Sequence, residues 1–220
     1  RDLVRSRGLG DVYKRQKDKL IEDIIASEWR MLDLVENIDR RASCQDDYTT
    51  FCAMRLSQFE TWDEDVLLNY WSDHQAAALC GHNLVERKYA YMMRYTAPEY
   101  YESELAPYLP VVTAEKEALI DSIMQIYMAW YREARSRWPN FAMRGRPADE
   151  DESFDMTTVE VYMRGELMSY SEETLKSFLN MAEGRRAEGQ NMVAMIYDNT
   201  ARQYGYASLD EAEELLKRGN

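Results

Sequence analysis

Gln58 and Glu166 are polar residues at positions that an amphipathic helix would bury. At helical spacing each shares its face with apolar or aromatic residues: Phe51, Met54 and Trp62 with Gln58, and Val159, Tyr162 and Tyr170 with Glu166. Burying a polar group without a partner costs about 2 kcal/mol or more, so a partner is expected, and Arg55 and Arg164 lie close by in sequence. Two interpretations stay open. The first is a buried salt bridge that only fixes packing; the second is a polar pocket in which Glu166 acts as acid, base or ligand.

The loops that precede these two segments carry arginines. The first loop, residues 40–47, contains Arg41, Gln45 and Asp47, and the second contains Arg144 and Arg146. Arginine ahead of a helix N-terminus favours an anion, because free backbone N–H groups and the helix dipole attract negative charge and the guanidinium matches phosphate or carboxylate. The alternative is that these arginines pair with nearby acids, such as the acidic run at residues 149–152.

Together these features predict a polar pocket for a small anionic ligand, which could also serve catalysis. The predicted catalytic residues are Glu166 and Asp47. The predicted ligand-binding residues are Arg41, Gln45, Gln58, Arg144, Arg146, Arg164 and Tyr170. The sequence identifies no metal, cofactor or reaction, because neither histidine completes a Glu-x-x-His pair and no phosphate-binding glycine loop occurs.

Amphipathic helices must position these residues. From Lys19 onward, apolar residues recur every three or four positions, and glycine and proline are scarce, which predicts an all-α fold. Residues 20–25 (LIEDII) resemble residues 119–124 (LIDSIM), and residues 49–89 resemble residues 157–197 at a constant offset of 108. The pattern predicts a single compact helical domain, residues 17–220, built from two pseudo-symmetric repeats.

The expected boundaries follow from this repeat. Repeat one covers residues 17–96, a proline-containing connector residues 97–112, repeat two residues 113–205 and a C-terminal helix residues 208–218. Gly81 and Gly189 are predicted to end helices, and Asn83 and Asn191 to cap the helices that follow. Residues 1–16 are expected not to belong to the domain, because DVYKRQ at residues 11–16 resembles a translated sequencing adaptor.

The composition of the chain disfavours some classes of binding partner. The chain has 40 acidic and 27 basic residues and a formal net charge of -13, which argues against binding to nucleic acid or to an anionic membrane. Its three cysteines are an odd number without a CxxC pair, as expected for free thiols in the cytoplasm. Cys44 would make a nucleophile only with a base, and none is evident.

Several segments resemble one bacterial family, domain of unknown function 4125. They are RASCQDD (41–47), MRLSQFETW (54–62), NLVERKYAYMM (83–93), RGRP (144–147), YMRGELMSYS (162–171) and YGYASLDEAEE (204–214). The similarity covers roughly Lys17 to Glu214. It implies a compact helical bacterial domain, with no activity that can be carried over, and the family's characteristic residues cluster in the two loops and the helices after them.

The leading hypothesis is therefore a cytoplasmic bacterial protein that binds a small anion between two repeats. The alternative is a non-enzymatic helical scaffold or a subunit of a homo-oligomer. That alternative predicts a large exposed surface of tyrosine and methionine rather than a pocket.

Overall fold

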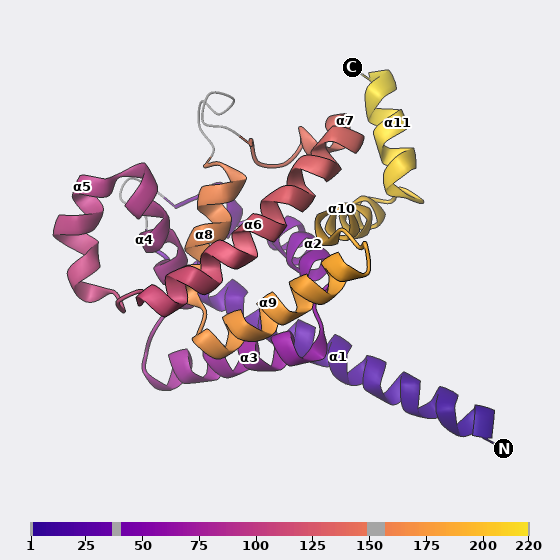
Figure 1. Cartoon of the computed structure of the whole chain (residues 1–220), viewed down its shortest axis with the longest axis horizontal. Coiled ribbons are helices and arrows are strands. Elements are labelled where there is room, and N and C mark those ends of the chain that lie inside the picture. Colours follow the sequence, from indigo (N-terminus) through magenta and orange to yellow (C-terminus); the bar gives the residue numbers. More distant parts are fainter. Residues whose placement is uncertain (1, 37–40, 149–156, 220) are drawn as a thin grey trace.

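The computed structural model of the chain describes residues 2–36, 41–148 and 157–219, with residues 2–12 described as a backbone helix (Figure 1). The longer helices are α1 (Asp2–Asp33), α2 (Tyr48–Phe59), α3 (Glu64–Leu79), α4 (Leu84–Thr96), α6 (Ala114–Arg137), α8 (Val159–Ser169), α9 (Glu172–Ala187), α10 (Met192–Gln203) and α11 (Leu209–Gly219). The shorter turns are η1 (Ser43–Gln45), α5 (Pro98–Tyr100), η2 (Tyr101–Leu105), η3 (Ala106–Tyr108) and α7 (Pro139–Ala142). This described part contains no strand, so the all-α prediction is confirmed.

Local sequence explains where several helices begin and end. Gly81 and Gly189 follow α3 and α9 with φ of 68° and 70°, a left-handed conformation that glycine adopts at little cost. Asn83 and Asn191 then cap α4 and α10, because each side-chain oxygen accepts a hydrogen bond from the backbone N–H three residues later at 3.0 Å. These predicted stops and caps are confirmed.

The helices pack in matching pairs (Figure 1). Helix α1 contacts α3 as α6 contacts α9, α4 packs along α8 as α10 packs along α2, and α3 and α9 lie against each other. The shared core contains Trp62, Phe59, Leu67, Leu175 and Phe178, each at most 1 % exposed. Because helices from both halves of the chain supply this core, neither half buries its apolar face alone.

Individual contacts recur in the same matched way. The backbone N–H of Ser171 donates to Asp73 Oδ2 at 3.0 Å, and that of Asp63 donates to Met181 Sδ at 3.2 Å. Both donors and both acceptors are 108 residues apart in sequence. Similarly, the side-chain amide of Asn83 donates to the backbone oxygen of Met31 on α1 at 2.7 Å. The side-chain amide of Asn191 donates to the backbone oxygen of Trp130 on α6 at 3.0 Å.

The ends of the chain differ in how they are held. Helix α11 lies against α7 and α10, and Glu213 accepts hydrogen bonds from the backbone N–H groups of Asn140 and Phe141 at 3.1 and 2.8 Å. At the other end, α1 runs without a break through residue 17, and its N-terminal part projects away from the other helices (Figure 1). Among the residues whose side chains are described, Lys17 is the first that hydrogen-bonds another helix or loop, and it donates to Trp62 O at 2.7 Å. In the described residues, no helix has both the length and the apolar character needed to cross a membrane.

Candidate functional site

Charged side chains meet in the core where α1, α2, α4 and α8 converge. Arg55 donates to both carboxylate oxygens of Glu28, at 2.6 and 2.5 Å, and to Glu166 Oε1 at 2.9 Å. Lys88 donates to the other oxygen of Glu166 at 2.7 Å. These four side chains are 2–10 % exposed. We use the name core network for Glu28, Arg55, Gln58, Tyr70, Lys88, Glu166 and Tyr170.

Two phenols complete the hydrogen bonding of the buried carboxylates. Tyr70 Oη on α3 donates to Glu28 Oε1 at 2.6 Å, and Tyr170 Oη after α8 donates to Glu166 Oε1 at 2.8 Å. The network therefore contains two carboxylates, two cations and neutral donors. Such a balance is what makes burial of charge tolerable, since an unpaired buried charge costs several kcal/mol, about 3–5 when one partner is removed.

The pKa shifts follow from burial and pairing. Burial raises the pKa of Glu166, but Arg55 and then Lys88 outweigh it and hold that pKa well below its usual range. Burial lowers the pKa of Lys88, but the attraction of Glu166 outweighs it, so the pKa is raised. Burial also raises the pKa of the Tyr170 hydroxyl, and Glu166 raises it further. At neutral pH, Glu166 and Lys88 are charged and Tyr170 is a neutral donor.

The Lys88 end of the core network reaches an aromatic ring that a second cation also contacts. Lys88 Nζ lies 3.7 Å from the ring centroid of Tyr162, and Arg146 Cζ lies 3.9 Å from the same centroid. Lys88 belongs to α4, Tyr162 to α8 and Arg146 to the segment after α7. We call these three side chains the Tyr162 site. Tyr162 and Arg146 are partly exposed, so this end of the network lies near the surface.

Tyr89 and Cys44 belong to the same neighbourhood. Burial raises the pKa of the Tyr89 hydroxyl, the charge of Lys88 lowers it, and Tyr162 and Cys44 raise it again. Cys44 is exposed in η1, within the first predicted loop, and all three cysteines are free thiols. Arg146 of the second predicted loop thus belongs to the Tyr162 site, and Cys44 of the first acts on Tyr89, the residue after Lys88.

The opposite end of the network is closed by a histidine. His74 is 1 % exposed and packs edge-on against Tyr70, with ring centroids 4.6 Å apart. Its Nδ1 lies 2.9 Å from Ser27 Oγ, whereas its buried Nε2 has no hydrogen-bond partner among the residues that the structure describes. Burial lowers the pKa of His74, which favours the neutral ring.

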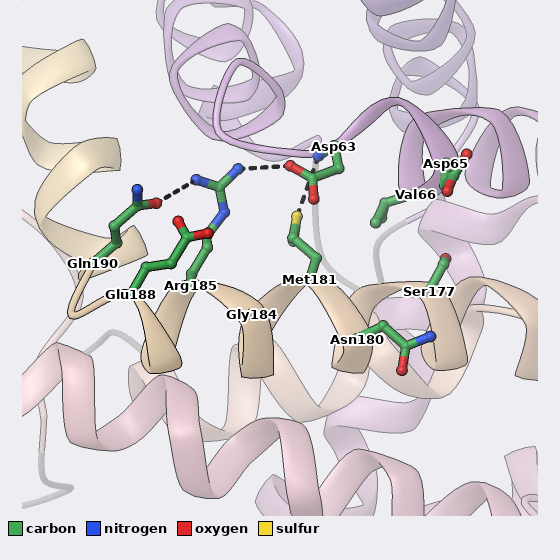
Figure 2. Close-up of a pocket in the computed structure, with 10 residues that line it drawn as sticks. All are labelled: Asp63, Asp65, Val66, Ser177, Asn180, Met181, Gly184, Arg185, Glu188 and Gln190. Carbon is green, nitrogen blue, oxygen red and sulfur yellow. Dashed lines mark hydrogen bonds and ion pairs between the residues drawn. The ribbon is translucent and has the colours of Figure 1, made fainter.

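A hollow of about 490 Å³ lies elsewhere, between the start of α3 and α9 (Figure 2). Figure 2 shows Arg185 reaching from α9 to Asp63, to which it donates at 2.8 Å, and to Gln190 at 3.1 Å. Asp65 and Glu188 also line the hollow and leave it with more acidic than basic side chains. The sequence interpretation did not single out this surface.

The structure brings together three of the predicted residues. Gln58, Glu166 and Tyr170 belong to the core network: Gln58 Oε1 accepts from Arg55 Nη1 at 2.8 Å, and Gln58 Nε2 lies 3.4 Å from Glu166 Oε1. Arg146 joins them at the Tyr162 site. The expected partner of the buried glutamate is Arg55 rather than Arg164, which instead donates to Asp121 and Glu160 at the surface, at 2.8 and 3.2 Å.

The remaining predicted residues lie apart from the core network. Arg41 is exposed and pairs with Asp33 and Asp46. Gln45 is buried beneath the first loop, where its amide donates to Leu32 O at 2.8 Å. Asp47 caps α2 by accepting from Thr50 N at 3.0 Å, a bond that lowers its pKa. Arg144 is exposed, and the acidic run at residues 149–152 lies outside the described residues.

The sequence interpretation missed Glu28, Tyr70 and Lys88. A signal for two of them exists in the helical periodicity. Glu28 follows Ile21 and Ile24 on the buried stripe of α1, and Lys88 lies four residues after Leu84 on the buried face of α4. Both are charged residues on apolar faces, the same pattern that singled out Gln58 and Glu166.

The donor types in the described residues do not favour a metal. No group of three or more histidine, cysteine, aspartate or glutamate side chains comes close enough there to hold an ion. The polar residues of the core network instead combine cations, carboxylates and phenols, which bind one another through hydrogen bonds and ion pairs.

Comparison with known proteins places the chain in a family. No curated protein and no solved structure matches it. A family described as "Protein of unknown function (DUF4125)" matches residues 18–214, the span that contains the core network and the Tyr162 site. The chain belongs to this family, DUF4125.

Proposed function

We propose that the protein binds a small anion, carrying a phosphate or carboxylate group, at the Tyr162 site. The observation that carries this proposal is the convergence of two cations on one ring, with Lys88 Nζ 3.7 Å and Arg146 Cζ 3.9 Å from the centroid of Tyr162. A contact with an aromatic ring leaves the net charge of the guanidinium in place, and a bound anion beside Arg146 would balance that charge.

The local charge balance supports a negative ligand. Inside the core network, two carboxylates balance two cations. Arg146 adds a further positive charge, and among the described residues no carboxylate lies at ion-pair distance from it. Among the described residues, the guanidinium of Arg146 makes one hydrogen bond, to Thr157 O at 3.3 Å, which leaves its other N–H groups for a ligand. The charge of Arg146 supports binding of an anion at this place, although the chain as a whole has a net charge of -13.

The proposal is binding, without an assigned reaction. Glu166 accepts hydrogen bonds on both oxygens, and its lowered pKa makes it a weak base and keeps it from being an acid at neutral pH. Asp47 is bound to the N-terminus of α2. The catalytic roles predicted for these two residues therefore stay hypotheses that the geometry does not strengthen, whereas the ligand-binding role of Arg146 gains support.

We further propose that the site lies between two repeats of a duplicated domain comprising residues 17–220. The matched packing of α1–α3 with α6–α9 supports this, as do the paired contacts of Ser171 with Asp73 and of Asp63 with Met181. Helix α4 of repeat one and α8 of repeat two supply Lys88 and Tyr162. Residues 1–16 are proposed to lie outside the domain, and the protein to act in the bacterial cytoplasm.

The test is isothermal titration calorimetry at low ionic strength, in which the protein is titrated with inorganic phosphate and, in a separate experiment, with a simple carboxylate. We expect saturable binding of one anion per chain that Arg146→Gln weakens by about tenfold or more, since a hydrogen bond to a charged group contributes about 1.5–3 kcal/mol. Arg132→Gln, which removes an exposed arginine of α6, is the control for net charge and should bind as the unaltered protein does. Equal weakening by both substitutions would mean diffuse attraction rather than a site.

One observation favours a second function, as an interaction protein. The segment between α4 and α6 exposes Tyr108 (86 %) and Val111 (85 %), with Tyr100 nearby in sequence. Exposed apolar side chains in one short segment are typical of a contact surface. Measurement of the mass in solution, with Tyr108→Ser and Val111→Ser, tests whether this segment joins copies of the chain.

A further inference from the structure

The two matched sets of helices differ in the chemistry of their buried faces. In the first set, Glu28, Arg55, Tyr70 and Lys88 are charged or carry a hydroxyl, and all are buried. The residues at the matched positions of the second set are Tyr127, Met163, Phe178 and Ile196. The correspondence uses the offset of 108 for α2, α3 and α4, and for α1 the alignment of residues 20–25 with 119–124.

Matched positions of the two sets can therefore be compared for how they fill the space between the helices. Met163 and Phe178 are 4 % and 0 % exposed, so the second set fills the equivalent places with side chains that need no ionic partner. Burying charged groups carries a desolvation penalty that apolar side chains of similar size avoid. At two of the four matched positions, those of Met163 and Phe178, the second set therefore packs without buried ionic groups.

We infer that Arg55 and Glu28 are positioning residues for the anion site, acting through Glu166 on Lys88. This inference rests on the proposed anion binding at the Tyr162 site.

The contacts form a continuous path. Arg55 is held by two hydrogen bonds from its guanidinium to Glu28, and Glu28 accepts a third from Tyr70 Oη. Arg55 then fixes Oε1 of Glu166, and Oε2 fixes the Lys88 ammonium. Bidentate pairing restricts both direction and distance, which a single contact between flexible chains would not do.

The position of Lys88 matters because its ammonium must contact both Glu166 and the Tyr162 ring. Without Arg55, Glu166 would keep Lys88 as its remaining cation and could draw it away from the ring and from Arg146. The second set has Ile196 where the first has Lys88, so the chain is expected to have one anion site and not two.

The experiment uses a double variant that keeps the core neutral, Glu28→Gln with Arg55→Met, and titrates it with inorganic phosphate by calorimetry. We expect phosphate binding about tenfold weaker, which corresponds to about 1.4 kcal/mol of binding free energy. Thermal unfolding should stay cooperative, with a midpoint within about 4 °C of that of the unaltered protein. The matched control is Arg94→Met with Glu117→Gln, which removes a partly exposed ion pair and should leave phosphate binding unchanged.

A second variant separates positioning from packing. Arg55→Lys keeps a cation between Glu28 and Glu166 without the bidentate pairing, so it should recover part of the affinity that the double variant loses. Phosphate binding that is unchanged in the double variant would overturn the inference while leaving the anion site intact. Loss of cooperative folding in the double variant, or an equal loss of affinity in Arg55→Lys, would also overturn it, because the network would then serve packing. Absence of phosphate binding by the unaltered protein would instead contradict the proposed function itself.

Discussion

Gln58 Nε2 on α2 and Glu166 Oε1 on α8 lie 3.4 Å apart, and the two residues are 108 positions apart in sequence, the offset of the proposed duplication. Trp62 and Tyr170, one helical turn further along and also 108 residues apart, have ring centroids separated by 6.2 Å. Corresponding residues that contact each other lie where a twofold axis between the two helices would pass. The core network is thus built around the centre of the proposed duplication, and only one side of it carries Arg55.

The two capping asparagines test that correspondence. Asn83→Ala and Asn191→Ala each remove a cap and a hydrogen bond to a carbonyl of a neighbouring helix. We expect each to lower the free energy of unfolding by about 1–2 kcal/mol, measured by urea denaturation. Losses that differ by more than about 2 kcal/mol would show that the two junctions are not equivalent.

Removing the central carboxylate should be far more costly than removing a surface one. Glu166→Gln leaves Arg55 and Lys88 with Glu28 as the remaining buried carboxylate of the network, so we expect a loss of about 3–5 kcal/mol in the free energy of unfolding. The control is Glu160→Gln, whose side chain is 47 % exposed and pairs with Arg164 on the same helix. Its loss should stay below about 1 kcal/mol. Similar losses for the two variants would mean that the core network is not balanced as described.

The distance between α4 and α8 depends on one glycine. A Cβ at Gly165 would lie 2.4 Å from Met92 Cγ and 2.9 Å from the backbone oxygen of Lys88, so Gly165→Ala must push the helices apart. We expect a destabilisation of about 1–3 kcal/mol and weaker anion binding, because Lys88 moves relative to Glu166. Gly184→Ala on α9 has open space around the new methyl group and should stabilise the protein by up to about 1 kcal/mol.

The buried histidine predicts a pH dependence of stability. Burial lowers the pKa of His74 from its usual 6.5, despite the opposing charge of Glu28. The unfolded chain therefore takes up this proton more readily than the folded protein. Stability should be fully present above about pH 6.5 and fall at lower pH, by at most about 1.4 kcal/mol per pH unit.

The measurement is urea denaturation between pH 5 and 7.5, in the unaltered protein and in His74→Gln. The Glu166 carboxylate also contributes stability that is lost on acidification, but that loss begins only as the glutamate of the unfolded chain takes up protons, near the low end of this window. His82→Gln, a substitution of the exposed histidine, should keep the slope. A slope that survives His74→Gln would contradict the assignment.

Helical periodicity was enough to predict the all-α fold, the helix stops at Gly81 and Gly189 and the burial of Glu166. Gln58 is only half-buried, and Met54, expected on the same buried face, is 44 % exposed. The periodicity also contained the information to choose Arg55 over Arg164, because residues three apart share a helix face and residues two apart do not. It could not reveal that Lys88 and Arg146 meet at Tyr162. That contact joins α4, α8 and the segment after α7, and depends on how distant helices pack rather than on local spacing.

The most direct test of the anion site is to map where phosphate binds, by following the backbone amide resonances of the labelled protein during a phosphate titration. We expect saturable shifts concentrated at Lys88 and Tyr89, at Arg146 and at the start of α8 up to Tyr162. Shifts concentrated instead around Asp63 and Arg185, at the hollow of Figure 2, or spread evenly over the surface without saturation, would contradict the central claim that the Tyr162 site binds an anion.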